Sequence, residues 1–221
     1  EAVIIMARDK RKEIESLQTR FFIHHFCLTA NIKMTGSELL LFVEGKRRGS
    51  SKYKRYVLGE KTPSPGTLVI MMNSLIERGV NASKVHELKQ LFDSPFWLVL
   101  DNSSSNNLNI DNFYSKFDRN IFNAVTKKRE LLIKPHRILR CSIDWRSIHK
   151  IEKIGTLDSL ACLLALLREE ENDNEPSFPT GTHSSAFRLL VSFFQQPSFF
   201  QFREEIWSRV TTDIVQYNVS I

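Results

Sequence analysis

The chain has 221 residues, 42% of them hydrophobic and 25% charged, which is the composition of a folded globular protein rather than a disordered one. Its apolar runs fall short of the roughly 18–20 residues that a membrane-spanning helix needs, and the opening stretch EAVIIMARDKRK has too short an apolar core for a signal peptide. The net charge of +6 is uneven: residues 1–66 carry +6, residues 67–140 carry +4 and residues 141–221 carry −4. A basic N-terminal part and an acidic C-terminal part favour a polyanionic partner for the N-terminal part, although solvated surface charge would give the same pattern.

The first helices are predicted from charge, periodicity and capping residues. A highly charged stretch over residues 7–20 predicts an exposed helix, and the apolar patch from Phe21 to Leu28 is expected to pack on the helices after it. Thr35-Gly-Ser-Glu38 before a run of Leu, Phe and Val is typical of a capped helix start. Gly45 is a suitable end for that helix.

A short basic helix and an apolar helix come next, joined by a turn with two prolines. We expect a helix over Lys52–Leu58, capped by Ser50 or Ser51. Residues 59–66 contain Pro63 and Pro65 and are predicted to be a connection, after which Thr67 caps the apolar helix. The predicted inward positions of that helix are Leu68, Met71, Met72, Leu75 and Ile76.

Two further helix starts precede the most polar run of the chain. Asn81 and Ser94-Pro95 each open an apolar pattern. Residues 101–107, DNSSSNN, have no periodicity and predict a linker or long loop. The sequence therefore predicts a basic domain over residues 1–100 and an acidic, Phe-rich helical domain over residues 108–221.

The second half also shows helical periodicity throughout. Apolar residues recur every three or four positions from Ile110 to Val125 and again over residues 142–154, and each stretch predicts one helix. Thr156 opens LDSLACLLALLREEE, which is expected to be buried, and residues 172–185 predict a loop before two Phe-rich helices split by Pro197. Because no alternating strand pattern occurs, the predicted fold class is all-α.

The segment from Lys46 to Arg55 carries the strongest functional signal. Six of its ten residues are Lys or Arg and none is acidic. Tyr53 and Tyr56 are three positions apart and share one helix face, which would leave the cations on the other faces. Such a helix can present positive charge to a phosphate backbone.

The stretch SSKYKRYVLGEKTPSPGTL resembles the recognition helix and following turn of the phage-repressor (Cro/XRE) type of helix-turn-helix, and the likeness extends over about residues 35–76. The resemblance implies buried anchors at both tyrosines, base contacts from Ser50, Ser51 and Arg55, and phosphate contacts from Lys52 and Lys54. Two features depart from the family pattern: Val57 stands where an acidic residue is common, and the connection carrying Lys46, Arg47 and Arg48 is longer.

We therefore expect a DNA-binding protein, a bacterial or mobile-element transcriptional regulator, with double-stranded DNA as its partner. The remainder, with SPFWLVL and LDSLACLLALLREEE, resembles uncharacterised bacterial helical proteins. The alternative is a non-catalytic interaction subunit of a mobile-element or defence assembly, in which the helix-turn-helix serves only packing. The predicted DNA-binding residues are Lys46, Arg47, Arg48, Ser50, Ser51, Lys52, Lys54, Arg55 and Lys61.

No enzyme, cofactor or metal is predicted. The chain has neither a GxxxxGK[ST] phosphate loop nor a GxGxxG motif. His24, His25 and Cys27 lie in an apolar run, which favours core residues over zinc ligands. His136, Cys141, Asp144 and His149 include the residue types of a nucleophile set, but Asp144 and His149 are five residues apart, a poor helical spacing for a direct hydrogen bond.

The C-terminal part is rich in aromatic residues, and the three cysteines of the chain favour reduced core thiols in a cytoplasmic protein. Core packing accounts for more than half of the aromatics, and the rest are expected to form a surface for a homodimer or a protein partner. The aromatic residues concerned are Phe178, Phe187, Phe193, Phe194, Phe199, Phe200, Phe202 and Trp207.

Overall fold

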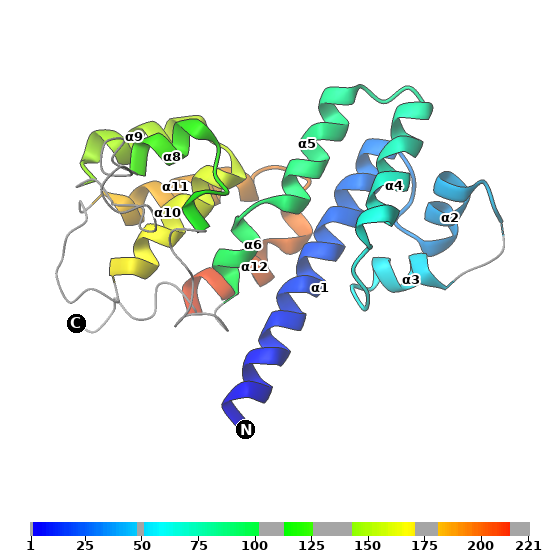
Figure 1. The fold of residues 1–221 in the computed structure, drawn as a ribbon, viewed down its shortest axis with the longest axis horizontal. Coiled ribbons are helices and arrows are strands. Elements are labelled where there is room, and N and C mark those ends of the chain that lie inside the picture. The colour runs from blue at the N-terminus through cyan, green and yellow to red at the C-terminus, as the bar shows by residue number, and fades with distance from the viewer. Residues whose placement is uncertain (1, 48–50, 102–112, 126–142, 171–180, 213–221) are drawn as a thin grey trace. The chain divides into compact units, whose positions relative to one another are not determined.

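The computed structural model describes residues 2–47, 51–101, 113–125, 143–170 and 181–212, with the backbone alone for residues 2–11, 169 and 170. These residues form helices, turns and bends with no strand among them, which confirms the predicted all-α class (Figure 1). Among the described helices, none combines the length and apolar character that crossing a bilayer requires. The chain divides into two compact units, Glu1–Ser94 and Pro95–Ile221.

The described part of unit 1 contains five helices. They are α1 (Ala2–Ala30), α2 (Gly36–Glu44), α3 (Lys52–Val57), α4 (Pro65–Glu77) and α5 (Ala82–Asp93) (Figure 1). The predicted caps of α2 and α5 are confirmed: Thr35 Oγ1 accepts from the Glu38 amide, Asn81 Oδ1 accepts from the Ser83 amide, and Gly45 ends α2 in the left-handed conformation.

Helix α4 begins earlier than the sequence predicts. Ser64, and not Thr67, is the N-cap, and its hydroxyl accepts from the Thr67 amide at 3.3 Å. Pro65 then occupies the first turn, where its fixed φ suits a helix and its missing N–H has no intrahelical partner to lose. Placing all of residues 59–66 outside the helix was therefore wrong for Pro65 and Gly66.

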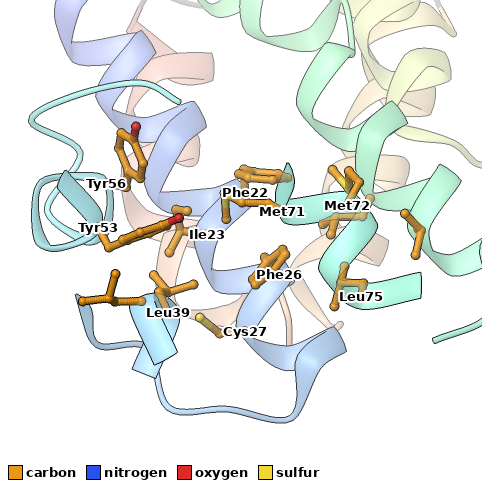
Figure 2. Packing of buried hydrophobic residues seen from close by; sticks show 13 residues of the cluster. Phe22, Ile23, Phe26, Cys27, Leu39, Tyr53, Tyr56, Met71, Met72 and Leu75 are labelled. Carbon is orange, nitrogen blue, oxygen red and sulfur yellow. The ribbon is translucent and has the colours of Figure 1, made fainter. Parts of the chain in front are cut away.

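The core of unit 1 is one continuous apolar cluster to which all five helices contribute (Figure 2). Helix α1 supplies Phe22, Ile23 and Phe26, which are completely buried. Because this helix is central, α3 and α5 both pack directly on it, while α2 packs on α3 and α4. The cluster consists of Phe22, Ile23, Phe26, Cys27, Leu39, Leu40, Tyr53, Tyr56, Met71, Met72, Leu75, Val85 and Leu88.

Ile76 and Leu28, both predicted to lie inward, are exposed. Ile76 is 50% exposed, because α4 turns its Met71 and Leu75 side toward the core and leaves Ile76 on the flank. Leu28 is also exposed, near the end of α1, while Phe21, Phe22 and Phe26 are buried as expected. The apolar pattern thus overstated the width of both buried faces. The helix predicted as exposed over residues 7–20 is part of α1, and it was wrong to expect it to be exposed throughout, since Ile14, Leu17 and Thr19 are buried.

Unit 2 begins with α6, a helix that the sequence assigned to the first domain. Its described elements are α6 (Phe96–Leu100), α8 (Arg119–Val125), α9 (Trp145–Ile154), α10 (Leu157–Glu170), α11 (Thr182–Phe194), the 3-10 helix η3 (Phe200–Phe202) and α12 (Arg203–Val210). Helix α6 packs on α10, so the division falls between Ser94 and Pro95, earlier than the predicted boundary at residues 101–107. Residues 102–107 lie outside the described part of the chain.

The prediction of one continuous helix from Ile110 to Val125 was wrong. Residues 115–117 form a turn and bend, and α8 starts only after Asp118. Asp118 Oδ1 accepts hydrogen bonds from the amides of Asn120 and Ile121, at 2.7 and 3.1 Å. The periodicity continued across the break, since Phe113, Phe117 and Ile121 are buried on both sides of it.

Helix α10 is the centre of unit 2, as its apolar sequence predicts. Every residue from Ser159 to Arg168 is buried, and α6, α9 and α11 pack around it. Glu152 joins α9 to α11: it accepts from Arg188 Nε at 2.6 Å, from Arg188 Nη2 at 2.8 Å and from the Ser185 hydroxyl at 2.7 Å. Helix α11 starts at Thr182, inside the loop predicted for residues 172–185.

Candidate nucleic-acid interface

Helix α3 is held in unit 1 by its two tyrosines. Tyr53 and Tyr56 are 1% and 2% exposed, and their rings meet edge to face with centroids 5.8 Å apart. Both belong to the core cluster, which confirms the predicted burial of this face (Figure 2). Burying a large side chain contributes on the order of 2 kcal/mol, so this face fixes the orientation of a helix that is too short to be stable alone.

Two glycines let the backbone of α3 and its following turn approach neighbouring helices closely. A Cβ on Gly36, at the start of α2, would lie 2.7 Å from the Lys54 amide nitrogen. Gly59 has φ +71° after α3, and a Cβ there would lie 2.3 Å from Ser16 Oγ on α1. The left-handed φ and both short separations favour glycine at these positions. Helix α3 is therefore fixed from two sides.

The outer face of α3 carries cations. Lys54 and Arg55 are exposed, as is Ser51 at the start of the helix, and Lys52 is half-buried. Arg47 before α3 and Lys61 after it are exposed as well. Since the tyrosines occupy the opposite face, the structure presents positive charge from three consecutive pieces of chain: the stretch after α2, α3 itself and the turn before α4.

Glu44 supplies a counter-charge that the sequence interpretation missed. Its Oε1 accepts from Lys52 Nζ at 2.7 Å and from the Tyr53 hydroxyl at 3.0 Å, and its Oε2 lies 3.6 Å from Lys46 Nζ. Hydrogen bonding from Lys52 holds the pKa of Glu44 below its ordinary value. Burial, together with the bond to Glu44, raises the pKa of Tyr53. Glu44, the last residue of α2, is thus bonded to the first turn of α3.

A second carboxylate lies near Arg55. Glu60 Oε2 is 3.7 Å from Arg55 Nε, and both side chains are more than half exposed. Ion pairs of this kind contribute about 0–1 kcal/mol and exchange readily with solvent or another anion. Arg55 therefore remains accessible to a polyanion, whereas Lys52 is held more firmly by Glu44.

Seven of the predicted DNA-binding residues lie in the described part of the chain: Lys46, Arg47, Ser51, Lys52, Lys54, Arg55 and Lys61. Of these, Lys46 and Lys52 both lie near Glu44, and Arg55 lies near Glu60. The other two, Arg48 and Ser50, lie outside the described residues. Of the two residues predicted to cap α3, Ser50 lies outside the described residues, and Ser51 occupies the N-cap position but its side chain makes no capping bond. Its backbone there is already helical (φ −67°, ψ −3°), which is not the extended geometry of a side-chain cap.

The cysteine of α1 is buried, and its two histidines are partly buried. Burial lowers the pKa of His25 to about 4 and also lowers that of His24, so both are neutral at pH 7. Burial raises the pKa of Cys27 to about 12, so the thiol stays protonated and is a poor nucleophile or ligand. Among the described residues, no group of three His, Cys, Asp or Glu side chains is placed to hold a metal ion.

The residues of the rejected nucleophile set have separate structural roles where they are described. Asp144 caps α9, because its Oδ1 accepts from the Ser147 amide at 2.8 Å. His149 Nδ1 lies 3.8 Å from Glu152 Oε2 and so faces the polar link between α9 and α11. His136 and Cys141 lie outside the described residues.

The aromatic residues near the C-terminus divide into core and surface. Phe193, Phe199 and Phe202 are buried, and Phe187 and Phe194 are half-buried. Phe200 is 58% exposed with the Arg203 guanidinium 4.1 Å from its ring centroid, and Trp207 is 43% exposed between the rings of Phe187 and Phe194. Phe178 lies outside the described residues.

Comparison with known proteins does not place the chain in a family. No protein-family model, no curated protein and no solved structure matches it. The likeness of residues 35–76 to the phage-repressor helix-turn-helix thus stays a prediction based on the motif. Function has to be inferred from the chemistry of the site.

Proposed function

We propose that the protein binds duplex DNA through α3 and the chain on either side of it, as a transcriptional regulator of a bacterium or a mobile element. One observation carries the proposal: Lys54 and Arg55 are exposed on a short helix whose Tyr53 and Tyr56 are buried. A helix anchored in this way can offer its cationic face to a groove without unfolding the core.

The charges on this surface suit a phosphate backbone. Arg47, Lys54 and Lys61 are exposed cations from three adjacent stretches, and each phosphate that they neutralise releases condensed counterions. Arg55 adds a forked donor that matches the two major-groove acceptors of guanine. Its partner Glu60 holds it only weakly, so exchange from carboxylate to base costs little.

The salt dependence of binding tests this proposal. We expect Arg47→Ala, Lys54→Ala and Lys61→Ala each to reduce the slope of log K against log salt concentration by about 0.9 for every phosphate that the variant no longer neutralises. Lys84→Ala, which removes an exposed cation from α5, is the matched control and should leave the slope unchanged. Equal slopes for all four variants, measured by fluorescence anisotropy with one duplex, would contradict DNA contact through α3.

Arg55→Ala separates specific from non-specific binding. If Arg55 reads a base, its replacement weakens binding to a selected site by about 1–3 kcal/mol and leaves binding to random duplex nearly unchanged. Selection of binding sequences from a random pool would supply the specific site. A chain that selects no sequence, yet binds duplex with a steep salt slope, is a non-specific binder.

A second candidate function is that of an interaction subunit, and the exposed aromatic residues of unit 2 favour it. Phe200 and Trp207 expose large apolar area in the acidic C-terminal part, and aromatic residues are enriched where proteins meet. The same surface could join two copies of a DNA-binding chain. Sedimentation of the native chain and of Phe200→Ser and Trp207→Ser variants distinguishes these cases: a monomer at high concentration with no protein partner rules out both.

A further inference from the structure

Unit 1 contains a cavity of about 360 Å³ beside the double-proline turn. The turn and the first half of α4 form one side, and the last turn of α5 forms the other. Val69 is 58% exposed at its edge, so the cavity opens to solvent. Its volume lies at the lower end of the range of small-molecule sites, about 300–1,000 Å³. The apolar lining consists of Pro63, Pro65, Leu68, Val69, Met72 and Phe92.

The walls of this cavity are fixed to α1 before any ligand arrives. The Thr19 hydroxyl donates to the Thr62 hydroxyl at 3.1 Å, which holds the turn, and Gln18 Nε2 donates to the Phe92 carbonyl at 2.6 Å, which holds the end of α5. The Phe92 ring also packs edge-on against Phe22, with centroids 5.0 Å apart. A ligand would therefore enter a preformed site and lose little free energy to ordering the protein.

The rim of the cavity carries two opposite charges. Lys89 Nζ and Asp93 Oδ2 are 2.7 Å apart, one helical turn from each other on α5, and both side chains are largely exposed. Such a pair is weak and exchanges readily. A head group with a single charge would meet one attraction and one repulsion here, whereas a head group carrying an anion beside a cation would pair with both side chains.

We propose that this cavity binds a free α-amino acid with an apolar side chain. Its carboxylate pairs with Lys89, its ammonium with Asp93, and its side chain lies against Leu68, Met72 and Phe92. Binding of the amino acid does not depend on DNA binding. A further consequence rests on the proposed function. A ligand in the cavity would make the turn that carries Lys61 more rigid, and so would affect how Lys61 is presented to DNA.

Titration calorimetry of the full chain with L-phenylalanine and L-leucine tests the site. We expect saturable binding with a Kd of about 0.1–1 mM, and binding at least about tenfold weaker for phenylacetate and phenethylamine, each of which has only one of the two charges. Lys89→Ala and Asp93→Ala should weaken binding of the amino acids. No saturable binding of either amino acid below about 10 mM, or equal binding of phenylacetate, overturns the proposal.

Two matched pairs of positions locate the binding. Val69→Trp fills the mouth and should abolish binding, whereas Ile76→Trp, also exposed on α4 but outside the lining, should not. In protein labelled at the methionine methyl groups, the Met72 signal should shift on titration while that of Met71, fully buried and outside the lining, stays in place. Binding that survives Val69→Trp, or shifts Met71 and not Met72, places the ligand elsewhere and refutes the site.

Discussion

Gly36 is the position at which a single methyl group should displace the proposed recognition helix. An added Cβ would lie 2.7 Å from the amide nitrogen and 2.8 Å from the Cα of Lys54. These atoms belong to the backbone of α3, so they cannot move aside as the tip of a side chain could. In Gly36→Ala, α2 and α3 must therefore move apart by several tenths of an ångström.

The expected cost follows from two opposing terms. Alanine in a helix is favoured over glycine by up to about 0.5–1 kcal/mol, and less than that in a first turn. Forcing a methyl group into a packed contact costs about 1–3 kcal/mol. The cost of the clash is larger than the gain in helix propensity, so Gly36→Ala should lower the free energy of unfolding by about 1–2 kcal/mol. Urea unfolding followed by circular dichroism measures the decrease, and faster amide exchange in α3 shows where it falls.

Gly66→Ala is the matched control. Gly66 also lies in the first turn of a helix, α4, but a Cβ there meets nothing within 4 Å. Its replacement should stabilise the chain by about 0.4–1 kcal/mol, since the unfolded state loses more freedom than the folded state. If Gly36→Ala proves as stable as Gly66→Ala, then α2 and α3 do not approach closely and α3 is not held as described.

Substitutions at three other positions test the polar contacts that fix α3 and α9. Tyr53→Phe removes the hydroxyl that donates to Glu44 and should cost about 0.5–1.5 kcal/mol, read from urea unfolding, whereas an unchanged free energy would show that the bond contributes nothing. Hydrogen bonding from Arg188 lowers the pKa of Glu152 from 4.5 to about 2. The ionised carboxylate therefore stabilises the fold above its unfolded pKa, and this contribution is lost as the pH falls from about 5 to 2. Glu152→Gln should flatten the dependence of the free energy of unfolding on pH in that window, and an unaltered dependence refutes the pairing. Asp144→Ala removes the N-cap of α9 and should lower the melting temperature, while Asp144→Ser keeps an accepting oxygen and should restore it.

Helix starts could be predicted where a capping side chain stood next to an apolar pattern, as at Thr35 and Asn81. The prediction failed where two nearby residues were both suited to cap the helix. Ser64 and Thr67 both suit a cap, and Pro65 decided between them by fitting the first turn. Asp118 interrupted an unbroken apolar period because its carboxylate bonds to amides two and three residues ahead. Periodicity reports which positions are buried, but it does not report whether the helix between them is continuous.

The candidate site could be predicted only in part, for a related reason. The cations and the tyrosines are contiguous in sequence, so their division between two faces of α3 followed from helical spacing. The counter-charges Glu44 and Glu60 lie on either side of α3, and their contacts depend on how the chain turns before and after it. The cavity was missed for the same reason, because its two walls, at Thr62 and Phe92, are each tied to α1 rather than to neighbours in sequence.

The two carboxylates beside α3 shape the proposed surface without cancelling it. Glu44 bonds Lys52 and Tyr53 through one oxygen, so its main effect is to fix the first turn of α3 against α2. Glu60 reaches only the exposed guanidinium of Arg55, at a separation where the pair adds little. DNA offers a dense row of phosphates, and counterion release rewards each one contacted. If DNA is the partner, as proposed, its phosphates would outcompete a single exposed carboxylate, and Lys54 and Lys61 are exposed to meet them.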